Sequence, residues 1–288
     1  MIKKPDFIKI PLKSLYFWAQ SLISKINTSY HPKNEYGRCN VCGSFAKFEY
    51  IELFNIDSKE VKSCNWDEEF TENINLTNSL ICKHCYSKFR IRCTADVLLN
   101  YFNEKSVKKL SRRKLENIKI LETGAIGSVF ATFSNIPCVI KSEFYDDVRT
   151  GESVNGIRCE DLQKLTFDDD SLDVIISLDV FEHIPEPYKA FSEVLRVLKP
   201  KGIAIITFPV DKRSKETKTV AELKEGNIIF HKDPSYHSDP IREEGSLVFT
   251  EFGQDISAIL NEKGFKVELK TYFTKNKEGY QYVLTIKK

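Results

Sequence analysis

The sequence lacks several features that would place it in a special class of protein. No apolar run reaches the roughly 18 residues that a membrane-spanning helix needs. Its 43 Lys and Arg nearly balance its 41 Asp and Glu, so net charge gives no argument for a nucleic-acid partner. It shows no internal repeat, no low-complexity tract and no secretory cleavage pattern near its start. We therefore expect a cytoplasmic protein with a sizeable core, since 41% of its residues are hydrophobic.

Cysteine is scarce after residue 93 and concentrated before it, which does not fit the dense disulfide framework of a small secreted domain. Two CxxC pairs, separated by residues 43–81, consist of Cys39, Cys42, Cys82 and Cys85. Four thiolates favour a closed, structural Zn²⁺ site in a zinc-ribbon-like module over residues 31–95 with an inserted hairpin. The alternative is four reduced, buried cysteines. Three other residues of this region could be alternate metal ligands or ordinary core and surface residues. They are Cys64, His84 and Cys93.

Residues 1–30 precede this module and are rich in both lysine and apolar side chains. Apolar residues recur on one helical face between Leu12 and Ile26, which predicts an amphipathic helix. The helix would pack on the protein. The alternative is a peripheral membrane contact in which Phe17 and Trp18 insert.

A basic strip, Lys-Phe-Arg-Ile-Arg at residues 88–92, follows the second cysteine pair. It could contact phosphate or an RNA backbone, or it could be a solvated strip before a helix at 95–102. Residues 96–117 are charged in their second half and are interpreted as a helical connector to the next domain.

From Ile118 onward, apolar runs alternate with glycine-containing or acidic turns, a rhythm that predicts βαβ units. The first strand leads into a turn at 123–128 whose glycines let the backbone approach a ligand, next to a helix start. The predicted strands are 118–121, 138–141, 156–158, 173–177 and 203–208, with an antiparallel pair at 265–270 and 280–286. The predicted helices are 187–198 and 250–261, the second with Thr250 as its N-cap.

Three stretches of this region resemble the signature of one enzyme family: Phe167–Ser177, Asp179–Pro185 and Leu195–Gly202. Together they are similar to the class I S-adenosylmethionine-dependent methyltransferases, in particular the small-molecule group called methyltransferase type 11. The resemblance covers residues 118–288. It implies an α/β fold with a Rossmann-like seven-stranded sheet, helices on both faces and the last strand antiparallel, and S-adenosylmethionine as the cofactor.

The resemblance also implies a set of cofactor-binding residues. Glu122 would face the amino-acid end of the cofactor, and Glu143 would accept the ribose hydroxyls. Asp161 would recognise the adenine amino group, with Leu162 covering the ring. The backbone and strand-end positions of the set are Gly124, Ala125, Gly127, Ser177, Leu178 and Asp179.

Some of these assignments have close alternatives. Asp146 or Asp147 could replace Glu143, and Glu160 could replace Asp161. The glycine turn departs from the family pattern, because Ile126 and Ser128 stand where the family usually has glycine. A Cβ at these positions would narrow the turn.

Methyl transfer to a hydroxyl needs a base, and histidine suits that role near neutral pH. The candidates are His183, after the fourth strand, and His231 or His237 in residues 230–240. Within that segment Tyr236 and Asp239 would orient the acceptor. The alternatives are a structural role for His183 and, for the segment, a hydrogen-bonded surface loop or a second metal site.

Three function classes follow. The first is a methyltransferase acting on a small-molecule or glycan hydroxyl, because the subgroup with this cysteine module looks like enzymes of glycan biosynthesis. The second is an RNA methyltransferase in which the zinc module binds RNA. The third, a non-catalytic zinc-ribbon adaptor, would need a cofactor site that cannot bind.

Overall fold

The structure is a computed structural model that describes residues 33–53, 59–64, 66–125 and 133–288. The predicted N-terminal amphipathic helix lies outside the described residues. So does the middle of the glycine turn, with Ile126, Gly127 and Ser128.

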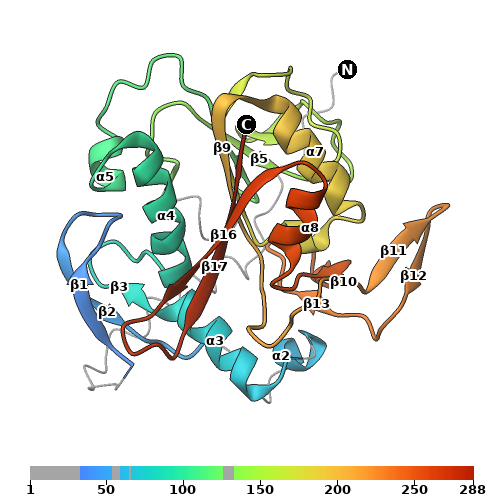
Figure 1. The fold of residues 1–288 in the computed structure, drawn as a ribbon, viewed down its shortest axis with the longest axis horizontal. Coiled ribbons are helices and arrows are strands. Elements are labelled where there is room, and N and C mark those ends of the chain that lie inside the picture. Colours follow the sequence, from blue (N-terminus) through green and yellow to red (C-terminus); the bar gives the residue numbers. More distant parts are fainter. Residues whose placement is uncertain (1–32, 54–58, 65, 126–132) are drawn as a thin grey trace, which may run out of the picture.

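The centre of the molecule is one mixed β-sheet with the strand order β16-β17-β9-β8-β4-β5-β7-β6 (Figure 1). Its strands are β4 (Ile120–Thr123), β5 (Val139–Glu143), β6 (Ser153–Val154), β7 (Ile157–Cys159), β8 (Leu172–Leu178), β9 (Leu198–Thr207), β16 (Lys266–Phe273) and β17 (Tyr280–Lys287). Strands β7, β5, β4, β8 and β9 run parallel, whereas β17 is antiparallel to both β9 and β16. The expected seven-stranded, Rossmann-like sheet with an antiparallel last strand is therefore confirmed.

The eighth strand, β6, is an addition at the edge of the sheet. It pairs with β7 through a two-residue turn at Asn155 and Gly156. Both residues have positive φ, of 52° and 78°, as a tight type I′ hairpin turn requires.

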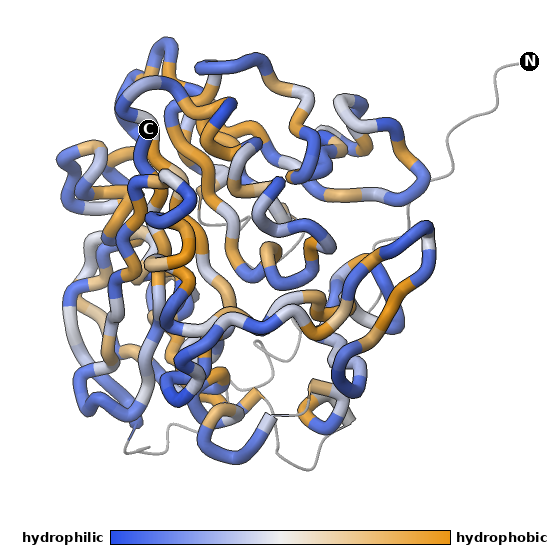
Figure 2. Tube along the Cα trace, turned by 45° about the vertical axis from the view of Figure 1, so that its right-hand side comes forward, coloured by the Kyte–Doolittle hydropathy of each residue, from blue (hydrophilic) through white to orange (hydrophobic). Residues whose placement is uncertain are grey.

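The two faces of the sheet are covered by different helices. On β8 and β9, Val174, Ile176, Ile203 and Ile205 belong to one buried cluster, and the residues between them belong to the other. Successive side chains along these strands therefore point alternately into the buried cluster on one face and the buried cluster on the other. Because both faces are buried, the strands are continuous apolar runs, which are orange in Figure 2. Helix α4 (Phe89–Phe102) packs on the first face, and α7 (Pro187–Val197) and α8 (Ile256–Glu262) pack on the second.

The cysteine-rich region forms a small three-stranded sheet of β1 (Glu35–Arg38), β2 (Phe45–Glu49) and β3 (Ile81–Cys82). Between β2 and β3 the chain forms α2 (Lys59–Cys64) and α3 (Glu68–Ser79), so the expected inserted hairpin is wrong. Asp67 caps α3 by accepting a hydrogen bond from Phe70 N at 2.9 Å. The buried residues of this small sheet join the same cluster as α4 and the central sheet.

All of the basic strip except Lys88, the N-cap residue, lies in α4, which begins at Phe89, six residues earlier than expected. Arg90 and Arg92 are 9% and 8% exposed, so they form neither a solvated strip nor a phosphate-binding one. Arg92 donates hydrogen bonds to the carbonyls of Leu80 and Ser87, and its guanidinium lies 4.0 Å from the ring centroid of Phe48. After α4, the short helix α5 (Val107–Leu110) leads toward β4.

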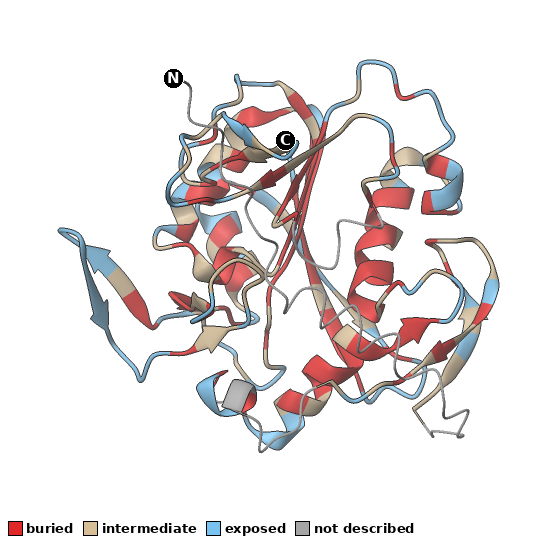
Figure 3. Cartoon of the chain, turned by 180° about the vertical axis from the view of Figure 1, so that it is seen from behind, coloured by how far each residue is buried: buried red, intermediate tan, exposed pale blue. Residues whose placement is uncertain are grey.

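The segment between β9 and α8 carries several short strands, and the helix predicted at 250–261 is present in its second half as α8. The short strands are β10 (Lys218–Thr219), β11 (Ala221–Lys224), β12 (Asn227–Phe230), β13 (Tyr236–His237), β14 (Ser246–Leu247) and β15 (Thr250–Glu251). Thr250 therefore pairs with Thr219 and is not an N-cap, because α8 starts only at Ile256. The β11–β12 hairpin stands out from the body of the molecule (Figure 3).

No helix in the described part of the chain is long and apolar enough to cross a membrane.

Candidate functional site

The candidate site lies at the carboxyl ends of the parallel strands, at the point where the strand order changes direction. From β4 the chain proceeds to β5 and β7 on one side, and then to β8 and β9 on the other. Ligands of open α/β sheets bind beyond the carboxyl ends of the strands at such a switch point. The register places Thr123 beside Ser142 on one side and beside Ser177 on the other.

Glu122 is fully buried at this switch point, and neither of its carboxylate oxygens has a hydrogen-bond partner among the residues that the structure describes. The hydroxyls of Thr123 and Ser177 are also buried, and no described residue forms a hydrogen bond with them. Burial raises the pKa of Glu122 to about 7, against the opposing charge of Lys141. Buried polar groups without partners are rare in folded proteins, so this cluster fits a ligand with complementary donors.

The backbone approaches closely just after β4. Gly124 has φ of 66°, and a Cβ there would lie 3.1 Å from a methyl group of Val180. Ala125 is fully buried, and its N–H donates to the carbonyl of Ser142 at 3.0 Å. The start of the predicted glycine turn is thus compact, as close contact with a ligand requires.

Glu143 ends β5, the strand next to β4, and its Oε1 accepts from Phe144 N at 3.1 Å. One alternative, Asp146, makes an ion pair with Arg242 at 2.9 Å. The other, Asp147, is exposed. Among these carboxylates, Glu143 is the one that ends a strand at the switch point.

The two acidic residues after β7 differ in exposure: Glu160 is buried and Asp161 is partly exposed. Glu160 is 4% exposed, and its Oε1 lies 2.5 Å from Arg158 Nε. Asp161 is partly exposed and accepts from Gln163 N at 2.8 Å. Leu162 beside it is buried. The carboxylate of Glu160 is thus used inside the protein, which leaves Asp161 as the candidate for a ligand contact.

Asp179 follows β8 in the left-handed conformation, with φ of 53°, and accepts from Thr207 Oγ1 at 2.8 Å. Arg90 of α4 makes an ion pair with it. Burial lowers the pKa of Arg90 to about 10, although the nearby charge of Glu182 acts in the opposite direction. Arg90 is a site residue that the sequence reasoning missed, since nothing in the sequence indicates that this basic residue folds against the end of β8.

Two of the three candidate histidines, His183 and His237, lie on either side of Glu182, for which the sequence predicted no role. Glu182 Oε1 lies 3.6 Å from His183 Nε2 and 3.6 Å from His237 Nδ1. The two rings are nearly perpendicular, with centroids 4.9 Å apart. Burial tends to raise the pKa of Glu182, but the two imidazoles outweigh it and the net effect is a lower pKa. We name this group the Glu182 cluster.

His231 is not part of the Glu182 cluster. Its Nε2 lies 3.1 Å from Glu222 Oε1 at the base of the β11–β12 hairpin, and its side chain is 45% exposed. Of the histidines expected in residues 230–240, only His237 reaches His183.

Asp239 holds its own loop together. Its carboxylate accepts from the backbone N–H groups of Ile241 and Arg242 at 2.6 and 3.0 Å, and from the Ser246 hydroxyl. With these hydrogen bonds Asp239 positions the loop that carries His237, and its expected contact with an acceptor stays a prediction.

The helical insert of the cysteine-rich region borders the Glu182 cluster. The ring centroids of Trp66 and His237 are 5.3 Å apart. The Cys64 thiol donates to the backbone carbonyl of Tyr236 at 3.2 Å, and Ser235 Oγ donates back to the Cys64 carbonyl at 3.1 Å. Cys64 therefore contacts β13 and lies outside the four-cysteine group, and Tyr236 is held through its backbone.

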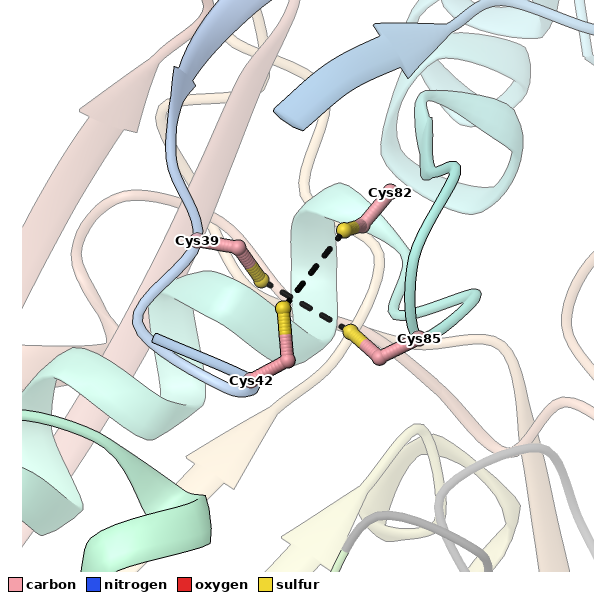
Figure 4. Close-up of side chains that lie close together, drawn as sticks. All are labelled: Cys39, Cys42, Cys82 and Cys85. Carbon is pink, nitrogen blue, oxygen red and sulfur yellow. Dashed lines mark hydrogen bonds between the residues drawn. The ribbon is translucent and has the colours of Figure 1, made fainter. Parts of the chain in front are cut away.

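The four cysteines of the two CxxC pairs converge on one point (Figure 4). The Sγ atoms of Cys39 and Cys85 are 3.7 Å apart, and those of Cys42 and Cys82 are 4.0 Å apart. Four thiolates bound tetrahedrally at about 2.3 Å would lie about 3.8 Å from one another, so the group can hold a metal ion.

The backbone of each pair turns in the way such a site needs. Each pair is followed by a residue with positive φ, Gly43 at 79° and Tyr86 at 59°, which curls the chain around the sulfurs. The residues considered as alternate metal ligands lie outside the four-cysteine group. Cys93 is buried within α4, and His84 is exposed.

Comparison with known proteins gives one family match and several local or distant likenesses. The family described as "Methyltransferase domain" matches residues 140–206. Uncharacterized methyltransferases from Mycobacterium avium and Mycobacterium tuberculosis are 44% identical over 46 residues, which is 16% of this chain and 18% of theirs. The chain thus matches less than a fifth of the length of these relatives.

Solved structures with a similar fold include an S-adenosylmethionine-dependent methyltransferase from Mesorhizobium loti and a protein from Pyrococcus horikoshii OT3. The first has a TM-score of 0.40 and 15% identity, over 63% of this chain and 95% of that one. The second has a TM-score of 0.41 and 18% identity, over 71% and 93%. At these values the fold assignment depends on the strand order of the sheet, and the likenesses add nothing to it.

Proposed function

We propose that this chain, which contains a class I methyltransferase domain, transfers a methyl group from S-adenosylmethionine to a hydroxyl group of a small-molecule or glycan acceptor. The observation that carries the proposal is the buried carboxylate of Glu122 at the switch point of the sheet, which no described residue pairs by a hydrogen bond. A cationic ligand group with several donors, such as the ammonium end of the cofactor, would satisfy both oxygens.

The residues around the switch point would divide the cofactor between them. Glu122 would bind the ammonium group, Glu143 the ribose hydroxyls and Asp161 the adenine amino group. Gly124 and Ala125 would let the cofactor lie against the backbone. When bound, the cofactor supplies an electrophilic methyl group, and the protein contributes the alignment of the acceptor oxygen.

The Glu182 cluster supports a hydroxyl acceptor. A hydroxyl oxygen must lose its proton as the methyl group arrives, and two imidazoles beside a buried carboxylate are suited to assist this loss. The cluster begins three residues after Asp179, at the edge where the family opens onto its substrate. The choice of a sugar hydroxyl is supported by the resemblance to the glycan-associated subgroup.

The RNA alternative loses its main sequence argument, because Arg90 and Arg92 are buried. Exposed basic residues persist nearby on residues 105–114, so RNA binding stays testable. Tight RNA binding that weakens steeply with salt would favour this alternative.

We also propose that the four-cysteine group holds a structural Zn²⁺ ion. The sulfur separations and the two left-handed turns fit a closed tetrahedral site. Because all four ligands come from the protein, the ion would stabilise the fold and take no part in methyl transfer.

The test of the cofactor site is calorimetry with S-adenosylmethionine. Glu122→Gln keeps the shape of the side chain but removes its charge, and it should weaken binding at least tenfold. Glu152→Gln, at an exposed glutamate, is the matched control and should bind like wild type. Equal affinity in all three proteins would refute the proposed cofactor site. A tritiated-methyl assay with nucleotide-sugar, glycan and RNA pools then identifies the acceptor class.

A further inference from the structure

A buried carboxylate faces two imidazoles where β8 ends. Both oxygens of Glu182 are buried, and within the described part of the chain neither has a hydrogen-bond partner. The two imidazole nitrogens at 3.6 Å are beyond hydrogen-bonding distance. A carboxylate removed from water costs several kcal/mol unless it is paired, so this arrangement is stable when a positive charge lies between the three groups.

The hydrogen bonds of His183 indicate which nitrogen is available. His183 Nδ1 lies 2.8 Å from the carbonyl oxygen of Leu247. A carbonyl can only accept, so Nδ1 carries the hydrogen, and in the neutral ring Nε2 presents its lone pair toward Glu182. A lone pair and a carboxylate that face one another repel. Metal-binding histidines show the same pattern, in which the second ring nitrogen donates to a backbone carbonyl and fixes the ring.

We propose that Glu182, His183 and His237 together bind a divalent transition-metal ion. Their ligand atoms all lie within 4.8 Å of one another. Ligands bound tetrahedrally at about 2.1 Å would be about 3.4 Å apart, close to the 3.6 Å that separates Glu182 Oε1 from each of the two histidine nitrogens. Two imidazoles and one carboxylate form the ligand set of many catalytic zinc sites and of other first-row metal sites.

Three protein ligands leave one position for a substrate oxygen, in contrast to the closed four-cysteine group. The cluster is also rigid: Trp66 packs on the His237 ring, and Asp239 holds the loop that carries it. A fixed, open metal site beside the carboxyl edge of the sheet is positioned for chemistry, whereas the cysteine group is positioned for stability.

The role of this ion rests on the proposed function. A hydroxyl oxygen bound at the open position becomes more acidic and releases its proton to solvent. The oxygen then forms its bond to the methyl carbon as the carbon–sulfur bond breaks, which gives a methyl ether, S-adenosylhomocysteine and one proton. Ion binding itself does not depend on this reaction.

The test is the metal content of the full chain after equilibration with Zn²⁺ and removal of loosely bound ions. Wild type should hold one more zinc per chain than Glu182→Gln and His237→Ala. His231→Ala, which alters a histidine outside the cluster, should match wild type. With Co²⁺, the thiolate charge-transfer band of the cysteine group should persist in each variant, which shows that the variants are folded. Equal metal content in wild type and in folded Glu182→Gln would overturn the proposal.

Methyl transfer separates the ion's role from the proposed function. Removal of the less tightly bound ion should lower the transfer rate on the order of 10²-fold, and added Zn²⁺ should restore it, with cofactor affinity unchanged. Undiminished transfer after that ion is lost would overturn its catalytic role. A one-ion difference between wild type and Glu182→Gln, without transfer to any acceptor, would support the metal site and refute the proposed function.

Discussion

Arg90 makes an ion pair with Asp179, although one follows the second cysteine pair and the other ends the fourth parallel strand of the central sheet. The contact joins the cysteine-rich region to the edge of the cofactor site. Helix α4 starts just after that pair and places Arg90 in its first turn. Helix α4 therefore connects the position of the cysteine group to the position of Asp179 at the end of β8.

Replacing Arg90 with alanine should destabilise the protein by about 2–3 kcal/mol. Removing one partner of a buried pair costs roughly 3–5 kcal/mol, and the 25% exposure of the Asp179 side chain reduces this cost. Urea unfolding measures the change. Arg112→Ala, at an exposed arginine, should stay within about 0.5 kcal/mol of wild type. Similar unfolding midpoints for the two variants would show that the ion pair contributes little.

Loss of the metal proposed for the cysteine group should loosen α4 and, through Arg90, weaken cofactor binding. Cys39→Ser should lose one zinc per chain and unfold at lower urea concentration, because metal-binding energy is part of the folding energy. Cys93→Ala is the matched control, since Cys93 is a buried cysteine outside the group, and it should keep its zinc. Full zinc content in Cys39→Ser would contradict the assignment.

The stability of the cofactor-free protein should fall as the pH rises through the range from about 4.5 to 7. Burial raises the pKa of Glu122 from its ordinary 4.5 to about 7, so the folded protein holds this proton more tightly than the unfolded chain does. The stabilisation is complete below about pH 4.5 and is lost as the pH approaches 7, a loss of at most roughly 3 kcal/mol. Glu122→Gln should remove this part of the pH dependence in urea titrations.

Cofactor binding should show the opposite trend. The ammonium group of the cofactor would favour the ionised form of Glu122, so affinity should rise between about pH 6 and pH 8. Calorimetry at several pH values measures this. A flat profile in wild type would argue against contact between Glu122 and the ammonium group, as would an identical slope in Glu122→Gln.

Replacing Glu143 with alanine should weaken cofactor binding about tenfold or more, because two ribose hydroxyls would lose a charged acceptor. Asp147→Ala removes an exposed carboxylate close by and serves as the control. If Asp147→Ala weakened binding and Glu143→Ala did not, the ribose partner would have been assigned to the wrong carboxylate.

Local patterns in the sequence predicted most of the central sheet. Strands such as β8 are continuous apolar runs bounded by turn and acidic residues, and their alternating burial follows from the period of two along a strand. The helix at Pro187 also begins where expected. The helix expected at 250–261 is present only in its second half, as α8, because its first residues gain strand pairing with β10 that no local pattern reveals.

The cysteine spacing and the family signature thus indicated the four cysteines as a candidate site and the strand ends as the place for a cofactor, since each CxxC pair and each stretch of the signature is local in the chain. The convergence of the two cysteine pairs, which residues 43–81 separate, was decided by the tertiary structure. The partners of Arg90 and Glu182 depend on how distant segments return to the same edge of the sheet. His237 reaches Glu182 only because β13 folds back beside α2 and η2 (Phe181–His183), and Arg90 meets Asp179 only because α4 packs across the sheet. Such contacts arise from the packing of the whole core, and neither composition nor spacing specifies them.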